Sequence, residues 1–464
     1  MSAYKSLVSL ALAFAATFLL AACNGTSSSS SSNAMVSVSL SDPATCGAPN
    51  GPFSHIYVTV TDVQINQSGS ASDNDPGWVD LTPTLSASPV QVDLLGTANQ
   101  CFLATLGSSG IQPGTYQQLR VILADNSTAV TGNKCDTAAN CVMLTADLTN
   151  TPYPLQLSSE SKTGIKIPSG QLAGGQFVVA AGDNKDLNVD FNACASIVVQ
   201  GNGQYRLKPV LHAGEVALQS TATSISGTVL DGVSQQPIVG GNIVVALEQN
   251  QNGVDRVVME TVTASNGTFS FCPVPAGSYD VVVSAYSANQ VYAATVITGV
   301  QPGDALHNVP LSPAGAPASI IGQITTAGSA ATSADLEVSA LQSIGTGLLI
   351  TTPLAEQSAA TITVSTTAGT CPVGTDCVTY TLSVPAANPS VGAFVASGNQ
   401  NPIPPATSPV NYTIDAMASI PGSAGQPDCN PSDLQTAKNS ANGSLTVTAG
   451  ASTTAATLAF TSCQ

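Results

Sequence analysis

The sequence predicts an all-β protein with several antiparallel β-sandwich domains in tandem, placed after a signal peptide and a flexible tether. Short runs of alternating apolar and polar residues recur along the chain, separated by turn residues that include 40 Gly and 29 Pro. Continuous helical periodicity is hard to find, and charged residues make up only 8% of the chain. These patterns are typical of short strands joined by many turns.

The N-terminus has the features of a secretory signal peptide, which we expect over residues 1–22. Lys5 gives the positive charge, and residues 7–20 are apolar except for Ser9 and Thr17. A spanning helix needs about 20 apolar residues, so a plain transmembrane anchor is disfavoured. Leu20-Ala21-Ala22-Cys23 resembles the bacterial lipobox, which implies cleavage before Cys23 and its lipidation. The alternative is an ordinary cleavage site with a chance cysteine.

Residues 23–33 are expected to form the lipid anchor and a serine-rich flexible tether, because residues 27–32 offer nothing apolar to bury. Two or more acyl chains hold a protein stably on a membrane, so we predict an exported, membrane-anchored lipoprotein. Asn24 points to the outer membrane, by resemblance to enterobacterial lipoproteins that an aspartate at this position retains at the inner membrane. The net charge of −17 argues against nucleic acid as a partner.

Ten cysteines remain beyond Cys23, and this even number predicts up to five disulfides outside the cytoplasm. Two closely spaced pairs are expected to close small surface loops: Cys135 with Cys141, and Cys371 with Cys377. Cys429 and Cys463 are paired by position alone. Three connectivities stay open for Cys46, Cys101, Cys194 and Cys272. Zinc is the rival hypothesis, but no CxxC spacing occurs and the chain has only three histidines, so no metal site is predicted.

The first domain is expected over residues 34–213. The strand at 36–41 alternates strictly, whereas the apolar residues in 56–65 change phase after Val60. A β-bulge near Thr61 or Asp62 would return Val63 and Ile65 to the core face. Further strands are predicted at 77–81, 90–94, 116–123, 154–157, 176–180, 187–191 and 205–211.

The order of motifs in this domain resembles domain-of-unknown-function family 4382, found in exported prokaryotic proteins. The likeness runs from near Val36 to His212 and rests on residues 39–43, 56–63, 92–95, 113–120, 163–167 and 207–210. The family brings no established activity. The resemblance therefore implies a folding unit and assigns no catalytic residue.

Polar loops in this domain allow several hypotheses. Two oxygen-rich clusters could bind calcium, although turn formation explains them more simply: Asp73, Asn74 and Asp75, and Asp183, Asn184 and Asp186. Trp78, the only tryptophan, is expected in the core in preference to a sugar-stacking platform. The loops at 67–76 and 126–140 are expected contact sites. Deleting residues 68–75 is expected to leave the fold intact, because that stretch has no apolar residue larger than alanine.

The second domain is expected over residues 223–312. Asn266-Gly267 predicts a tight hairpin, and an alternating apolar set is predicted in the core: Phe269, Phe271, Tyr279, Val281 and Val283. This spacing resembles the carboxypeptidase regulatory-like domain, a transthyretin-type sandwich. The resemblance implies a structural module, grouped by fold with carbohydrate-binding sandwiches. Cys272 departs from the family pattern, and a bridge from it to Cys194 is one of the open pairings.

The third region, residues 317–464, repeats the second in diluted form. Residues 319–324 are similar to 224–229, 335–342 to 242–249, and 380–386 to 269–276. We expect a degenerate β-sandwich, closed by strands at 445–447 and 457–460.

No catalytic motif occurs: the chain lacks GxSxG, HExxH, GxxxxGK and a GxGxxG placed between strand and helix. We therefore predict no enzyme and no cofactor, with a glycosidase carboxylate pair as the enzymatic alternative. The predicted function is a non-catalytic cell-envelope lipoprotein acting as a surface adhesion, spacer or assembly module. A glycan-binding lipoprotein for polysaccharide capture is the alternative. The expected partners are the membrane, through Cys23, and a surface glycan or envelope protein.

Overall fold

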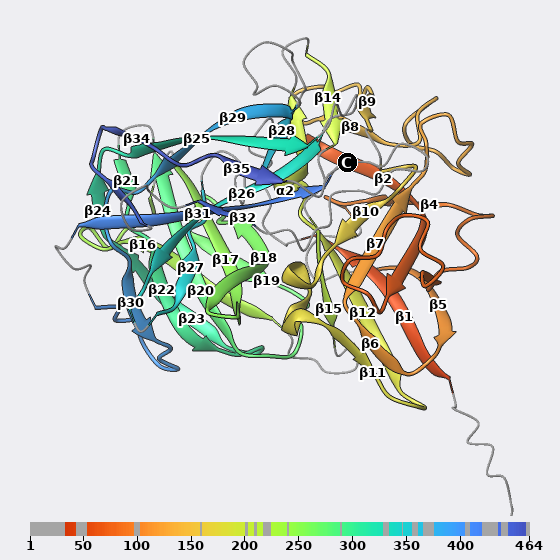
Figure 1. Cartoon of the computed structure of the whole chain (residues 1–464), viewed down its shortest axis with the longest axis horizontal. Coiled ribbons are helices and arrows are strands. Elements are labelled where there is room, and N and C mark those ends of the chain that lie inside the picture. The colour runs from red at the N-terminus through yellow and green to blue at the C-terminus, as the bar shows by residue number, and fades with distance from the viewer. Residues whose placement is uncertain are drawn as a thin grey trace, which may run out of the picture.

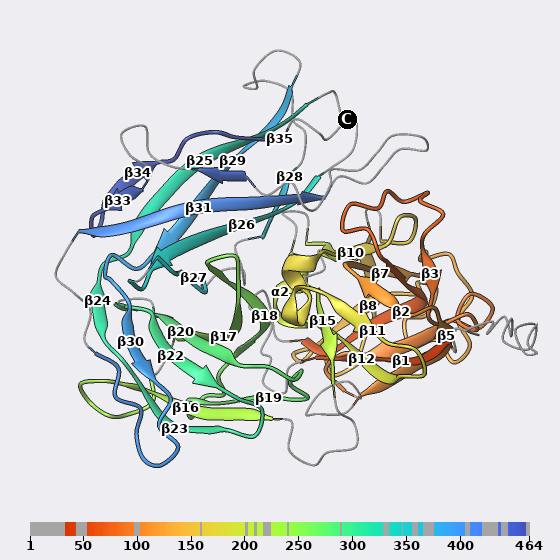
Figure 2. The ribbon, with the colours of Figure 1, turned by 60° about the horizontal axis from the view of Figure 1, so that its bottom comes forward.

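The computed structural model describes residues 33–42, 53–96, 103–157, 160–199, 203–207, 211–216, 224–238, 241–287, 290–327, 334–345, 347–354, 361–364, 375–403, 409–419, 435–437 and 444–460. Their regular secondary structure is almost all β-strand, and the strands form three lobes (Figure 2). The helical pieces are short: η1 (Ser169–Gln171), η2 (Ala173–Gly175) and α2 (Ala193–Ser196). The all-β prediction is confirmed. Within the described ranges, no helix has the length and apolar character needed to cross a membrane.

The first lobe, residues 33–216, packs two sheets around one core. Its four-stranded sheet runs β15 (Leu211–Glu215), β12 (Asn184–Phe191), β1 (Ala34–Ser41) and β5 (Ala104–Ile111). Its nine-stranded sheet contains β2 (Phe53–Asn66), β3 (Val79–Asp80), β4 (Val90–Asp93), β7 (Gln118–Leu123), β8 (Cys141–Leu144), β9 (Tyr153–Gln156), β10 (Ile165–Ile167), β13 (Ile197–Val199) and β14 (Tyr205–Leu207). β6 (Gly114–Tyr116) pairs with β11 (Phe177–Val179). β1 pairs with β12 in parallel, which departs from the purely antiparallel expectation.

The predicted β-bulge in β2 is present. The register of β2 against β7 shifts between Val60 and Asp62, and the side chains of Val63 and Ile65 are buried. β5 was not predicted, because its sequence, Ala-Thr-Leu-Gly-Ser-Ser-Gly-Ile, has the composition of a turn. Its pairing with β1 supplies the hydrogen bonds that override this local preference.

The second lobe, residues 224–315, encloses the predicted core. A three-stranded sheet of β16 (Ile225–Asp231), β19 (Thr268–Phe271) and β23 (Ala305–Leu311) faces β17 (Gly241–Gln251), β18 (Val254–Val262), β20 (Tyr279–Ser287), β21 (Gln290–Tyr292), β22 (Thr295–Val300) and β24 (Pro313–Gly315). The five residues predicted to alternate into the core are all buried. Gly267 does adopt a positive φ in a tight turn. The hairpin prediction is wrong, however, because this turn leads from β18 in one sheet to β19 in the other.

The third lobe, residues 318–460, repeats the pairing of the second. β25 (Ala318–Ala327) pairs antiparallel with β29 (Thr375–Val384) and parallel with β34 (Ser452–Thr454) and β35 (Leu458–Phe460). β16 likewise pairs antiparallel with β19 and parallel with β23. The other strands are β26 (Ala334–Ser343), β27 (Leu349–Thr351), β28 (Thr361–Val364), β30 (Ser390–Ala393), β31 (Val410–Ser419), β32 (Gln435–Ala437) and β33 (Leu445–Val447).

One sheet of 13 strands runs through the second and third lobes. β27 pairs in parallel with β18, and β30 pairs in parallel with β22, beside which it lies in Figure 2. Figure 1 shows the first lobe beside this joined pair. The second and third lobes are therefore joined by backbone hydrogen bonds between their strands.

Candidate functional site

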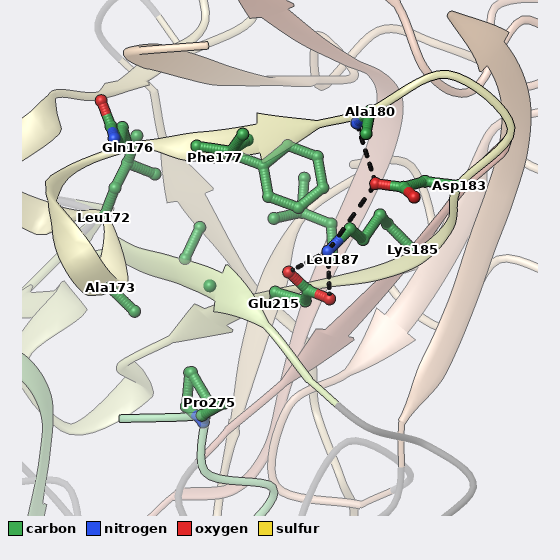
Figure 3. A pocket seen from close by; sticks show the side chains of 14 residues that line it. Leu172, Ala173, Gln176, Phe177, Ala180, Asp183, Lys185, Leu187, Glu215 and Pro275 are labelled. Atoms are coloured by element: carbon green, nitrogen blue, oxygen red, sulfur yellow. Dashed lines mark hydrogen bonds and ion pairs between the residues drawn. The ribbon is translucent and has the colours of Figure 1, made fainter. Parts of the chain in front are cut away.

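A pocket of about 290 Å³ lies where the first lobe meets the second (Figure 3). β11, β12, β15 and η2 form its walls in the first lobe, and Pro275 and Ala276 close it from the second lobe. The apolar side chains that line it include Leu172, Phe177 and Leu187, which are buried. The pocket therefore has a lining of mixed apolar and polar character at a junction between lobes.

Lys185 is the central charged residue of the pocket. Its Nζ lies 2.8 Å from both carboxylate oxygens of Glu215 and 4.0 Å from Asp183 Oδ2 (Figure 3). Asp183 is held in the turn before β12, where its Oδ2 accepts a hydrogen bond from the backbone N–H of Ala180 at 2.8 Å. Lys185 and Leu187 share one face of β12, and Leu187 is paired with Glu215 of β15. The fold thus brings the three charged groups together and neutralises the single ammonium.

This arrangement has no evident catalytic chemistry. The lining contains no Ser, Thr, Cys, His or Tyr that could act as a nucleophile or proton relay. Its two carboxylates, Asp183 and Glu215, contact the same ammonium, whereas the two carboxyl groups of a glycosidase flank the scissile bond of a substrate. The side chains of the pocket are suited to bind and orient another group.

The only buried histidine of the described residues, His212, also fails as a catalytic group. It pairs across β12 and β15 with Asp190, and both residues are buried. Burial raises the pKa of Asp190 to about 7 and lowers the pKa of His212 to about 4. The pair lines no part of the pocket and is closed off from a substrate.

Among the predicted cysteine sites, the structure forms the Cys135–Cys141 disulfide, with Cα atoms 5.6 Å apart. Both cysteines are buried, while Asp136 and Thr137 in the loop that they close are exposed. Cys377 and Cys272 are each in a disulfide. Several candidates lie outside the described residues: Cys23, Cys46, Cys101, Cys371, Cys429 and Cys463. The side chain of Cys194 is likewise not described.

The proposed calcium residues have protein partners. Asp73 Oδ1 lies 2.8 Å from Lys166 Nζ, and Asp75 Oδ1 accepts a hydrogen bond from the backbone N–H of Gly77 at 2.7 Å. Across the part of the chain that the structure describes, no three His, Cys, Asp or Glu side chains are grouped to hold a metal ion. Asp75 and Asp183 act as turn formers, the simpler of the two hypotheses.

The loop before β3 is tied to the sheet by polar contacts, which the predicted tolerance of a deletion of residues 68–75 did not take into account. Asp73 pairs with Lys166, whose side chain is 3% exposed, and the backbone oxygen of Asp73 accepts a hydrogen bond from Arg120 Nη1 at 3.0 Å. Trp78 is half-buried and is not a core residue, since the Arg120 guanidinium carbon lies 4.2 Å from its ring centroid. Arg120 therefore covers one face of the only indole.

Sequence reasoning missed most of the pocket. Asp183 was singled out for calcium and Pro275 for its place in a family motif, but neither Lys185 nor Glu215 was given a role. The one local signal is Lys185 itself, because the whole chain has only 10 Lys and Arg residues and this one lies next to a predicted strand. A basic residue this rare is a reasonable marker of a specific ion pair.

Comparisons with solved structures give only weak likenesses. A chain of the type II cohesin–X-dockerin complex from Acetivibrio cellulolyticus is 25% identical over 20% of this chain and 58% of its own length, with a TM-score of 0.15. A DUF3823 family protein from Bacteroides uniformis is 10% identical over 44% of this chain and 92% of that chain, with a TM-score of 0.16. A streptococcal ancillary pilin is 10% identical over 81% and 96%, also with a TM-score of 0.16. These scores are too low to indicate a common overall fold.

None of the curated proteins is significantly similar to this chain in sequence. Two family models do match, and neither describes a catalytic domain. The chain carries, in this order, a match to the domain of unknown function DUF4382 over residues 33–209 and a match to the carboxypeptidase regulatory-like domain over residues 224–311.

Proposed function

We propose that the chain is a non-catalytic bacterial cell-envelope lipoprotein, attached to the outer membrane through lipidated Cys23, that acts as a surface adhesion, spacer or assembly module. The pocket supports this proposal most directly, because its charged side chains are paired with one another and its lining contains no hydroxyl, thiol or imidazole group. Three β-lobes in lateral contact offer exposed loops and strand edges as contact surfaces.

The anchor is tested by Cys23→Ala. The variant is expected to lose lipid modification and to move from the detergent phase to the aqueous phase on partitioning. Unchanged partitioning would mean that the apolar segment stays uncleaved as a membrane anchor, and would contradict the lipoprotein assignment.

The contact function is tested with the same lipid-free variant. We expect it to bind isolated envelope fractions without converting polysaccharide or peptide substrates. Substrate turnover that is abolished by Asp183→Asn would contradict the non-catalytic assignment.

Glycan capture is the second candidate function. Gln176, Asp183, Lys185 and Glu215 line the pocket and can hydrogen-bond sugar hydroxyl groups. The pocket's aromatic ring, Phe177, is only 5% exposed and offers no open face for stacking a sugar. Calorimetric titration with soluble glycans separates the two functions, since binding that is lost in Glu215→Gln would favour capture.

A further inference from the structure

Three acidic side chains meet at the junction between the second and third lobes. Glu248 on β17 is paired across the strands with Asp280 on β20, and Asp255 is the second residue of the adjacent β18. Glu248 and Asp255 are buried, and Asp280 is half-buried. Carboxyl groups this deep need partners.

Hydrogen bonds connect these acids to one another and across the junction. The carboxyl group of Asp280 hydrogen-bonds to that of Asp255. The backbone N–H of Thr351, on β27, donates to Glu248 Oε2 at 3.0 Å. The Thr351 hydroxyl donates to the backbone oxygen of Asp255 at 2.8 Å. Thr351 thus links the third lobe to two of the three acids of the second.

The strands around these acids offer no positive charge that is free to neutralise them. Arg256 is the only Lys, Arg or His in β17, β18, β20, β27 and β31. Its Nη2 lies 2.7 Å from Asp415 Oδ2 on β31, so its charge is used there. The remaining carboxyl group on these strands is that of Glu260 on β18, which adds further negative charge. Oε1 of Glu248 is buried without a hydrogen-bond partner among the described residues.

These surroundings favour protonated acids. Burial, followed by the nearby charge of Asp255, raises the pKa of Asp280 to about 6. Burial also raises the pKa values of Asp255 and Glu248, and neighbouring acids add to the effect on Glu248. Two carboxyl groups in contact are stable when they share one proton and repel each other when both are ionised.

We propose that this junction is a proton-operated joint, in which β27 is held firmly on β18 while the Asp255–Asp280 pair keeps its proton and is released locally when the pair becomes doubly charged. A raised pKa stabilises the closed junction fully below about pH 4, the usual range of an aspartate. That stability is lost as the pH rises through the folded pKa of about 6. The joint therefore tightens in mild acid and loosens at neutral pH, independently of any lipid anchor.

Hydrogen exchange of the full-length chain tests the joint. After correction for intrinsic rates, the peptide that covers residues 349–352 should exchange roughly ten-fold faster at pH 7.0 than at pH 5.0, since opening releases about one proton at pH 5.0 and almost none by pH 7.0. In Asp280→Asn and in Asp255→Asn this ratio should fall close to one, because the remaining carboxyl can pair with a neutral amide. Asp136→Asn, at an exposed acid of the first lobe, is the matched control and should keep the ratio of the unaltered chain.

Two results would overturn the proposal. One is a ratio near one in the unaltered chain, or an unchanged ratio in both junction variants. The other comes from calcium: if calcium chloride at pH 7.0 restores protection in the unaltered chain, relative to EDTA, and does so in neither variant, the carboxyl groups are cation ligands and not a proton switch.

Discussion

The two junctions of the molecule are built from different chemistry. Between the first and second lobes, the backbone N–H of Gly174 donates to Gln249 Oε1 at 2.8 Å and Gln251 Nε2 donates to the backbone oxygen of Gly170 at 3.1 Å. Between the second and third lobes, strands of both lobes share one sheet, and Arg256 and Asp415 form a buried ion pair. The hydrogen bonds across the first junction join neutral groups, whereas the second junction has a shared sheet and a charged pair.

This difference determines how each junction can open. The first can separate without breaking a strand ladder, and its neutral amide contacts do not respond to pH. The second cannot separate without exposing backbone groups and buried carboxyl groups to water. We therefore expect substitutions at the second junction to destabilise the protein most.

The largest effect is expected from Arg256→Met. The side chain of Asp415 is 2% exposed, so removing Arg256 leaves a buried carboxylate unpaired and should lower the free energy of unfolding by about 3–5 kcal/mol. Urea unfolding measures this loss. Adding Asp415→Asn should recover part of it, and a double variant no more stable than the single one would show that the ion pair is not the cause.

A smaller effect is expected from Asp190→Asn. This substitution changes how the stability of the first lobe depends on pH and leaves the acids of the second junction unaltered. Because burial raises the pKa of Asp190 to about 7, the ionised form destabilises the fold as pH rises from about 4 to about 7. Between pH 4.5 and 7.5 the unaltered chain should lose about 2–3 kcal/mol more unfolding free energy than the variant. His212, with its pKa lowered to about 4, acts in the opposite direction in both proteins, so the difference isolates the carboxyl group.

Asp73→Ala tests how firmly the loop before β3 is held. The substitution leaves the nearly buried ammonium of Lys166 without Asp73 and should lower the free energy of unfolding by about 1–2 kcal/mol. Asn74→Ala, at the exposed neighbouring position, is the control and should change it by less than about 0.5 kcal/mol. Equal effects in chemical denaturation would mean that the loop does not depend on the ion pair.

The smallest effect is expected from Gly214→Ala at the first junction. A Cβ at this position would lie 2.7 Å from the Ala173 Cβ and 2.7 Å from the Pro275 Cγ. We expect a loss of about 1 kcal/mol, with faster hydrogen exchange confined to residues 169–176. Faster exchange that also appears at residues 349–352 would show that the two junctions are coupled.

The alternation of apolar and polar residues predicted the features that depend on residues close together in the sequence. The phase change after Val60 located the bulge in β2, and the alternation around Phe269 and Tyr279 located the core of the second lobe. What could not be predicted depends on partners far along the chain. Gly-rich β5 becomes a strand only against β1, and Asp73 is held by Lys166, far from it in sequence.

The pocket and the second junction were missed for the same reason. Lys185 and Glu215 come together through the register of β12 and β15, and Thr351 reaches Glu248 only because β27 crosses to the sheet of the second lobe. Sequence periodicity identifies which face of a strand is buried, but it does not identify the neighbouring strand. The repeat of the second lobe in the third predicted a second sandwich and gave no sign that the two would share a sheet.

The position of β1 has a mechanical consequence. β1 begins at Ala34, immediately after the segment proposed as the tether, and it lies inside its sheet with β12 on one side and β5 on the other. A pull applied through residue 33 along the strand acts parallel to β1, so it loads the hydrogen bonds to both neighbours in shear, all at once, and does not peel them apart one by one. A chain held by its N-terminal end under flow would therefore load the first lobe in shear, the direction in which paired strands resist separation most strongly.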